Sequence, residues 1–347
     1  MKLLVSALEH SANIHLQSVK EHLGDGVEFM GIFNKELGNP LIDMRSLAIM
    51  GIVDAIKKLP FFLKLSREML ALAKDADKIL LIDSSGFNLP LAKKIKKAYP
   101  EKEILYYILP QAWAWKKKRI GVLTKTIDTL ASILPFEASY YPKEANIEYV
   151  GHPLLDQIKE FKISLSQEIK HIAFMPGSRR VEITKLMPIY KELVTKLACK
   201  ATLIIPPHFS DKEVKELYGD TSAFEISHTP HKTLYKSDFA FICSGTATLE
   251  AALIGTPFVL NYIAKSLDYF IGSRLVKLSH VGLANIMFEK MGKGILHPEY
   301  LQDTVTVENL QQAYESYNRE KFLGNSKLLR EYLKHGSAQR VAQLIKE

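Results

Sequence analysis

The sequence contains little cysteine and no long apolar run. Its two cysteines, Cys199 and Cys243, are far apart and match no metal-binding or redox spacing, which is typical of reduced thiols in a cytosolic protein. A transmembrane span needs about 20 apolar residues, and no such stretch occurs. The apolar start at residues 1–5 leads directly to Glu9 and His10, so it predicts a short strand rather than a secretory signal. Neither a His-x-x-x-His pair nor a paired acidic cluster is present, and we therefore expect no metal site.

Strand and helix patterns alternate along the whole chain. With 347 residues, 47% of them hydrophobic and 24% charged, the chain is a folded protein larger than one core usually allows. Strands that alternate with helices predict an α/β fold with parallel sheets. We expect two Rossmann-like, doubly wound domains at residues 1–155 and 165–325 that face a central cleft. A helical tail at residues 326–347 could pack back on the first domain.

The expected elements can be assigned to short ranges. Strands are expected at residues 2–7, 78–83, 104–108, 129–134, 147–150, 171–175, 201–205, 223–227, 238–242 and 257–260. Helices are expected at residues 12–23, 47–57, 60–74, 88–98, 137–141, 181–198 and 247–254, followed by a helical stretch at 307–346 that is broken near Gly324 and Gly336.

The most informative turn follows the expected strand at 238–242. Ser244, Gly245 and Thr246 are small residues between this strand and a helix, where backbone N–H groups and the helix N-terminus favour a phosphate. One helical turn later, the Glu250 carboxylate could accept two hydroxyl hydrogen bonds from a sugar or ribose. The pattern predicts a nucleotide-sugar site. An ordinary strand–helix turn with an exposed glutamate is the alternative.

A second turn with anion-binding character follows the expected strand at 171–175. Gly177 allows a tight turn, Ser178 offers a hydroxyl, and Arg179 offers a bidentate fork for a diphosphate. The sequence is not a P-loop, because the Lys-Ser/Thr ending is absent. A plain strand–turn–helix junction is the alternative. Two such turns in one half together favour a nucleotide diphosphate.

Two turns of the first half carry candidate proton-transfer groups. Asp83 ends an expected strand, so its carboxylate could act as a general base toward a hydroxyl in the cleft, or it could cap the following helix. Glu9 and His10 follow the first strand and can transfer protons or orient hydroxyls. Ser11, next to them, is equally plausible as a helix cap.

The net charge of +8 is distributed unevenly. Basic residues are dense at 93–119, which would attract nucleic acid, anionic lipid or a phosphorylated substrate, unless the lysines simply form a solvated helix face. Both tryptophans, Trp113 and Trp115, lie at the end of this patch. The apolar-basic segment 47–67 could lie in a membrane surface, although a buried core helix is the more common explanation.

In their order and spacing, several motifs resemble one family, the lipid-A-disaccharide synthases, which are inverting glycosyltransferases of the GT-B architecture. The resemblance covers residues 9–287. The motifs that carry it are Leu47-Ala-Ile-Met-Gly-Ile-Val53, Asp83 with Phe87-Asn88, Trp113-Ala-Trp115 with Lys118-Arg119, Leu134-Pro-Phe-Glu137, Val150-Gly-His-Pro153, Pro176-Gly-Ser-Arg179, Ser244-Gly-Thr-Ala-Thr-Leu-Glu250 and Asn285.

This resemblance implies a substrate pair and a reaction. UDP-2,3-diacylglucosamine would donate its sugar to 2,3-diacylglucosamine 1-phosphate (lipid X), giving the β-1,6-linked disaccharide 1-phosphate and UDP, without a metal or other cofactor. The nucleotide would bind the second domain. The enzyme would be cytoplasmic and peripherally associated with the inner membrane through segments 47–67 and 113–119. Nucleic acid is not an expected partner, and an oligomer is compatible with the sequence.

The resemblance also assigns roles to residues. Asp83 matches the general base, and Glu9 and Asn285 match residues near the reacting sugars. The residues expected to hold UDP are Arg179, Ser178, Ser244, Gly245, Thr246 and Glu250. Those expected to contact the acceptor or the sugars are His10, Ser11, Asn88 and Asn285.

Two departures from the family pattern concern the same region. The first turn of the family reads Gly-Glu-x-Ser-Gly-Asp, whereas this chain has Leu8, Ala12 and Asn13 at the two glycines and the final acid. Gly86 stands where the family carries a second aspartate, which leaves Asp83 as the only carboxylate of its loop. Another UDP-sugar enzyme of GT-B fold is the main alternative, since it would share the turns at 176–179 and 244–250 but does not need segment 47–65.

Overall fold

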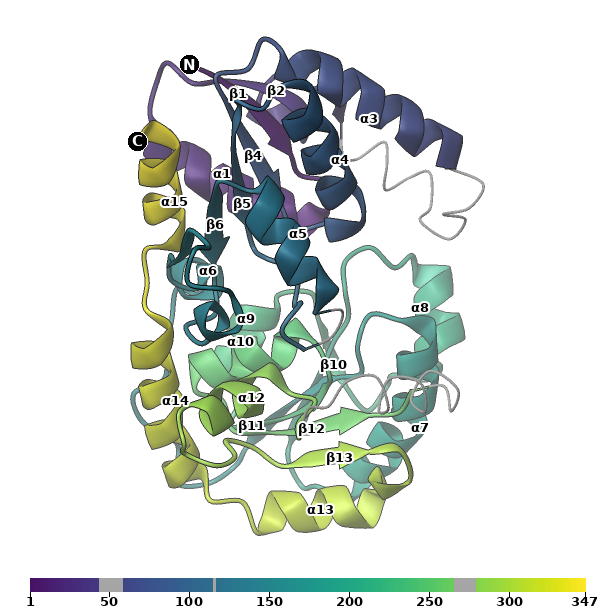
Figure 1. Ribbon diagram of the computed structural model, residues 1–347. Coiled ribbons are helices and arrows are strands. Elements are labelled where there is room, and N and C mark those ends of the chain that lie inside the picture. Colours follow the sequence, from purple (N-terminus) through teal and green to yellow (C-terminus); the bar gives the residue numbers. More distant parts are fainter. Residues whose placement is uncertain (44–58, 115–116, 265–278) are drawn as a thin grey trace. The chain divides into compact units, whose positions relative to one another are not determined.

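The chain divides into two structural units. The computed structural model describes residues 1–43, 59–114, 117–264 and 279–347 (Figure 1). The first unit comprises Met1–Asp156 together with Leu333–Glu347, and the second comprises Gln157–Tyr332. The final helix therefore belongs to the first unit. The expected boundary between residues 325 and 326 falls inside helix α14 (Arg319–Leu333).

The first unit is built on one seven-stranded parallel sheet of order β3-β2-β1-β4-β5-β6-β7. Its central strands are almost continuously apolar, because helices cover both faces of a parallel sheet. The strands are β1 (Lys2–Ser6), β2 (Glu28–Phe33), β3 (Ile42–Asp43), β4 (Lys78–Ile82), β5 (Glu103–Tyr107), β6 (Thr129–Ser132) and β7 (Ile147–Tyr149).

Side chains that alternate along these strands form two cores, one on each face. Leu3 and Val5 pack toward α1 and α15, whereas Leu4 packs toward α3 and α4. Helices α1 and α15 lie side by side, although they come from opposite ends of the chain (Figure 1). The helices of this unit are α1 (His10–Leu23), α3 (Leu59–Ala73), α4 (Ser85–Ala98), α5 (Lys118–Thr126), α6 (Pro153–Gln157) and α15 (Ser337–Lys346).

The second unit has a six-stranded parallel sheet of order β10-β9-β8-β11-β12-β13. Its strands are β8 (His171–Met175), β9 (Lys200–Ile204), β10 (Glu225–Ser227), β11 (Phe239–Cys243), β12 (Phe258–Tyr262) and β13 (Glu299–Leu301). Its helices are α7 (Arg180–Lys196), α8 (Asp211–Tyr218), α9 (Pro230–Lys236), α10 (Thr246–Ile254), α12 (Leu283–Lys290), α13 (Val307–Glu315) and α14. The α/β fold with two doubly wound parallel sheets is thus confirmed.

Strand order reverses once in each sheet. The first strand of each unit, β1 or β8, pairs with the next strand in the chain on one side and with β4 or β11 on the other. Ligands of open α/β sheets bind beyond the carboxyl ends of the strands at such a switch point. The turns after β1, β4, β8 and β11, together with the beginnings of the helices that follow them, carry all the predicted site residues except Asn285.

The local predictions were incomplete: besides β2, the expected ranges lacked β3, β13, α5, α6, α8, α9 and α12. Within β2, a Cβ at Gly31 would lie 2.3 Å from the Val5 carbonyl oxygen, so only glycine fits beside β1. Helix α14 continues through Gly324 instead of breaking there. Phe322 and Ser326 on either side are buried, and this packing overrides the weak helix propensity of glycine. The expected helix at 47–57 lies outside the described residues.

Candidate functional site

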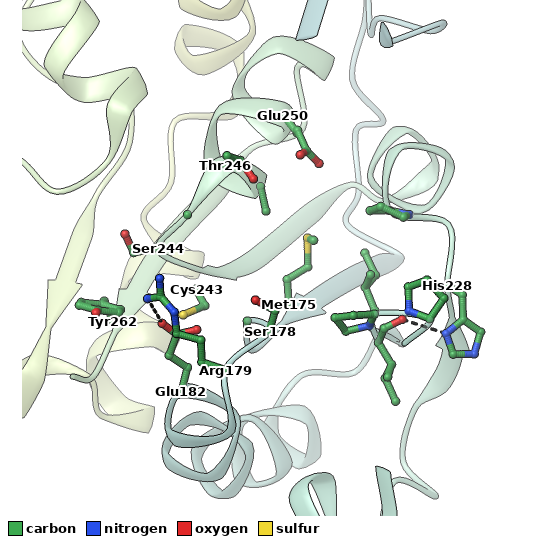
Figure 2. A pocket seen from close by; sticks show the side chains of 18 residues that line it. Met175, Ser178, Arg179, Glu182, His228, Cys243, Ser244, Thr246, Glu250 and Tyr262 are labelled. Carbon is green, nitrogen blue, oxygen red and sulfur yellow. Dashed lines mark hydrogen bonds and ion pairs between the residues drawn. The ribbon is translucent and has the colours of Figure 1, made fainter. Parts of the chain in front are cut away.

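A cavity of about 610 Å³ lies at the switch point of the second unit. Five strands contribute to it, because β8, β9, β10, β11 and β12 all end at its edge. In Figure 2, Arg179, Glu182, Ser244 and Tyr262 gather at one end and His228 lies at the other, with Glu250 on a third side. The turns at 176–179 and 244–250, singled out from the sequence, therefore line one cavity.

The turn after β8 places the Arg179 cation at the cavity, where the buried Glu182 carboxylate pairs with it. Gly177 has a φ of +100°, and a Cβ there would lie 2.6 Å from the Glu182 carboxylate, so the turn requires glycine. The Arg179 guanidinium forms an ion pair with Glu182 at 3.0 Å. Arg179 is 77% exposed at its side chain and Glu182 only 7%, so the arginine faces the cavity while its partner is buried. Ser178, beside them, also lines the cavity.

Glu182 was not predicted as a site residue. Its position three residues after Arg179, in the first turn of α7, is the spacing at which helical side chains meet, and this was the available signal. Its burial against Gly177 and Cys243 depends on the tertiary structure.

The turn after β11 presents the N-terminus of α10. The Ser244 N–H already donates to the Asn261 carbonyl at 3.3 Å. Thr246 begins the helix and Gly245 is its N-cap, and the first N–H groups of a helix lack partners within it. All three residues line the cavity. This turn thus directs backbone donors and a helix dipole into the space that Arg179 also faces.

Glu250 lies one helical turn further along α10. Its Oε2 is 3.3 Å from His231 Nε2, and its side chain remains 15% exposed. Because Glu250 lines the cavity, its carboxylate is accessible to a ligand while the histidine fixes it from one side.

The remaining end of the cavity is apolar. It is lined by Ile204, Ile205, Pro206, Pro207, His228 and Pro230. The His228 ring is fixed, since its Nδ1 lies 2.8 Å from the Ile205 carbonyl oxygen. Flat apolar walls next to backbone polar groups suit a planar heterocycle.

The first unit brings two carboxylates together at its own switch point. Ser84 Oγ donates to Glu9 Oε1 at 2.9 Å, so the turns after β1 and β4 are joined. Burial raises the pKa of the Asp83 carboxyl above its ordinary value, and the nearby Glu9 carboxylate raises it further, whereas the Ser84 N–H opposes this shift. Asp83 does not cap the following helix, because Ser84 is the N-cap of α4.

Other predicted residues of this region differ in exposure. His10 and Ser11 are exposed in the first turn of α1, where a ligand can reach them. Arg119 of α5 donates to Ser85 Oγ at 2.9 Å and so adds a cation near the start of α4.

Two predicted substrate contacts are buried instead. Asn88 is fully buried; its amide donates to the Ile82 and Asp83 carbonyls, and its oxygen accepts from Ser6 Oγ. Asn285 is also fully buried; its amide donates to the His297 carbonyl and to Glu299, and its oxygen accepts two backbone N–H groups. Their hydrogen-bonding groups are engaged within the fold, which suits supporting residues.

The predicted membrane segments are only partly described. Residues 44–58 and 115–116 lie outside the described ranges. Trp113 is 4% exposed and packs edge-on against Phe136, with the two ring centroids 4.9 Å apart. Its ring is therefore not free to lie at a membrane surface, as the sequence suggested. Across the described ranges, no helix has both the length and the apolar character needed to cross a membrane. The same residues contain no group of three or more His, Cys, Asp or Glu side chains arranged to hold a metal ion.

Solved structures with similar folds include glycosyltransferases and a UDP-GlcNAc 2-epimerase. Acinetobacter baumannii MurG superposes with a TM-score of 0.61 at 15% identity and 99% coverage of both chains. The Neisseria meningitidis UDP-GlcNAc 2-epimerase bound to UDP-GlcNAc gives 0.61 at 12% identity, with full coverage of both chains. At these identities the likeness supports the GT-B fold.

Sequence comparison is more specific. The chain is 50% identical to the lipid-A-disaccharide synthase of Helicobacter pylori (strain G27), covering 98% of this chain and 96% of the relative. It is 46% identical to the Campylobacter jejuni (strain RM1221) enzyme of the same name, covering 99% of each. A family profile described as lipid-A-disaccharide synthetase matches residues 3–346. From these matches and its GT-B fold, the chain belongs to the lipid-A-disaccharide synthase family of glycosyltransferases.

Proposed function

We propose that the chain transfers 2,3-diacylglucosamine from UDP-2,3-diacylglucosamine to the 6-hydroxyl of 2,3-diacylglucosamine 1-phosphate (lipid X), with inversion at the anomeric carbon. The products are the β-1,6-linked disaccharide 1-phosphate and UDP. The observation that carries this proposal is the cavity at the β8/β11 switch point, where an arginine and a helix N-terminus meet opposite a carboxylate. That set of groups matches a diphosphate followed by a ribose diol.

The donor nucleotide occupies this cavity. The Arg179 fork and the N–H groups of Gly245 and Thr246 hold the diphosphate, because both are strong anion donors. Glu250 accepts the ribose hydroxyls. The uracil ring lies against the apolar walls near His228. Ser178 and Ser244 contribute hydroxyls at the phosphate end.

The reaction is a single displacement. The acceptor 6-oxygen attacks the anomeric carbon as the bond to the UDP oxygen breaks, and Asp83 takes the hydroxyl proton. Burial and the Glu9 carboxylate raise the pKa of Asp83, which makes it a stronger base than an ordinary aspartate. Arg179 and the α10 N-terminus stabilise the negative charge that develops on UDP. His10 and Ser11 orient acceptor hydroxyls from the first turn of α1.

Glu250→Ala tests the ribose assignment. The variant should raise KM for the UDP donor by about tenfold, since a hydrogen bond to a charged group contributes roughly 1.5–3 kcal/mol, and it should change kcat much less. His231→Ala, which removes only the partner at 3.3 Å, should have a smaller effect on KM. Initial-rate kinetics with varied donor measure both. A fall in kcat at unchanged KM would exclude Glu250 as the ribose acceptor.

Because both substrates carry acyl chains, the enzyme has to contact a membrane. Helix α3 carries side chains suited to this contact. Leu59 and Leu63 are 57% and 45% exposed, and Lys64 and Arg67 are exposed on the same helix. A helix with exposed leucines and cations suits an anionic membrane surface. In the proposed function the enzyme is cytoplasmic and binds the inner membrane peripherally, with α3 as the contact surface.

Vesicle co-sedimentation tests this surface. The double variant Leu59→Ser, Leu63→Ser should bind anionic vesicles about tenfold less. The exposed parts of the two leucines, 57% and 45%, together amount to about one side chain, and burying one leucine contributes roughly 1.5–3 kcal/mol. Ile163→Ser is the matched control, since Ile163 is 93% exposed and lies in the second unit. Equal vesicle binding by the double variant and the control would rule out α3 as the membrane contact.

The basic patch does not need a nucleic-acid partner to explain it. Lys96 pairs with Asp128 at 2.8 Å, Lys94 donates to Ser66 Oγ, and Lys102 donates to the Ala76 carbonyl. These lysines stabilise their own unit.

A further inference from the structure

The turns that carry Glu9 and Asp83 share one construction. Each follows a central strand, β1 or β4, and leads into a helix, α1 or α4. Glu9 is the N-cap of α1 and Ser84 the N-cap of α4, and in both helices an asparagine lies four residues after the cap. These residues, Asn13 and Asn88, are 2% and 0% exposed.

Asn13 fastens the turn after β1. Its amide nitrogen donates to the Ala7 and Glu9 carbonyls, both at 2.8 Å. Its amide oxygen accepts the Asn34 N–H at 2.7 Å, which links the turn to the end of β2. Only an amide can donate twice and accept at the same time, since a carboxylate has no proton to donate. The asparagine that replaces the family acid therefore has a defined structural use in this chain.

Asn88 fastens the turn after β4 in the same way. Its amide nitrogen donates to the Asp83 carbonyl at 2.8 Å and to the Ile82 carbonyl at 3.2 Å. Its oxygen accepts from Ser6 Oγ, at the end of β1, at 2.6 Å. In both turns the asparagine thus binds the carbonyl six residues before it.

The turn after β4 needs such support. Asp83 and Ser84 have φ angles of 49° and 43°, in the left-handed region that costs free energy for residues other than glycine. Two consecutive residues persist there only when surrounding contacts determine their conformation. The Tyr106 hydroxyl adds a second bond to the Asp83 carbonyl, at 2.5 Å.

The two turns are also joined to each other. The register of β1 and β4 pairs Ser6 with Leu81, so the residues that follow them, Ala7 and Ile82, are also neighbours. Asn13 and Asn88 donate to the carbonyls of these two residues. Ser6 reaches across to Asn88, and Ser84 reaches back to Glu9. A shift of either turn would therefore change the position of the other carboxylate.

We propose that Asn13 and Asn88 are positioning residues that together fix the Glu9 and Asp83 carboxylates relative to one another, without touching substrate. The proposal rests on the function proposed above, in which Asp83 is the base. It goes further by naming the buried residues that hold this base in a strained turn and beside the carboxylate that raises its pKa.

Steady-state kinetics on Asn13→Ala and Asn88→Ala test the proposal. We expect kcat to fall by about 10²-fold, because a displacement of about 1 Å at a reacting group costs that much, while KM for the UDP donor stays within about twofold. The acid limb of the kcat–pH profile of Asn88→Ala should move to lower pH, since a released Asp83 is more hydrated and further from Glu9. A purely structural role would lower thermal stability without moving this limb.

Three further variants sharpen the result. Asn13→Asp keeps the size but cannot donate, so it should resemble Asn13→Ala rather than the parent chain. Ser6→Ala removes only the bond to Asn88 and should give a smaller loss of kcat with the same direction of pH shift, even if Asn88→Ala fails to fold. Asn146→Ala is the matched control: Asn146 donates to the Asp128 carbonyl at 2.9 Å, before β6 in the same unit, and its loss should leave kcat unchanged.

The outcomes separate this inference from the proposed function. If Asp83→Asn stays active, Asp83 is not the base, and the proposed function fails at that step whatever the asparagine variants do. If Asp83→Asn is inactive but folded Asn88→Ala or Ser6→Ala retains the parental kcat and pH profile, the positioning inference is overturned. If folded Asn13→Ala and Asn13→Asp both retain the parental kcat, the positioning inference is overturned for Asn13.

Discussion

Asp83→Asn should lower kcat by about 10²–10⁴-fold, the usual contribution of a general base. KM for the UDP donor should change little, because the nucleotide cavity is built entirely from residues of the second unit. Asparagine matches aspartate in size and can accept the Ser84 N–H bond, so the turn should keep its shape. A folded Asp83→Asn protein with near-normal kcat would contradict the assignment and direct attention to Glu9 and His10.

The assignment of Asp83 as the base also predicts the direction in which kcat changes with pH. Asp83 must be deprotonated to accept a proton, so kcat should rise with pH through its pKa. Burial first, and the Glu9 charge second, raise that pKa, so the acid limb should lie above the range of an ordinary aspartate. Glu9→Gln removes the second cause and should move the acid limb to lower pH. An acid limb that does not move in Glu9→Gln would contradict the coupling of these two carboxylates.

Arg179→Ala should reduce kcat/KM for the donor by about 10²–10³-fold, comparable with the loss of one preorganised donor to a developing anion. Two effects combine here. The variant removes the bidentate cation, and it leaves the buried Glu182 carboxylate facing the diphosphate without its partner at 3.0 Å. The double variant Arg179→Ala, Glu182→Gln should therefore recover part of the loss, since it removes the uncompensated charge.

The neighbouring arginine provides a matched control. Arg180 pairs with Glu216 at 2.7 Å and is not among the residues that line the cavity. Arg180→Ala should keep kcat/KM within about twofold of the parent chain, because surface ion pairs contribute little. Equal losses from Arg179→Ala and Arg180→Ala would show a general charge effect and not a diphosphate contact.

The sequence predicts the residues of the candidate sites better than the residues that support them. Gly177 and Ser244 follow apolar strands of the second sheet, and Glu9 and Asp83 follow apolar strands of the first. Because the carboxyl ends of parallel strands meet at one edge of a sheet, local pattern was enough to gather each pair within its own unit. Glu182 and Asn13 were missed as functional residues because their importance depends on what surrounds them. No periodicity indicates that Glu182 is buried beneath Arg179, or that Asn13 reaches three backbone groups.

The same reasoning explains the asparagines at 88 and 285. Their position in family-like motifs suggested contact with sugars, whereas the structure has both fully buried and bonded to their own backbone. Motif membership identifies residues that a site needs, but it does not distinguish residues that touch a ligand from residues that hold its neighbours. Gly324 shows the corresponding limit for secondary structure, since packing of α14 overrides a local helix breaker.

The central claim is the transfer reaction itself. Purified protein incubated with UDP-2,3-diacylglucosamine and 2,3-diacylglucosamine 1-phosphate, in buffer with a chelator, should release UDP and form the tetraacyl disaccharide 1-phosphate in equal amounts, as measured by mass spectrometry. The new linkage should be β by proton NMR coupling, and Asp83→Asn should form almost none. Absence of disaccharide from the folded parent chain, or UDP release without it, would contradict the account.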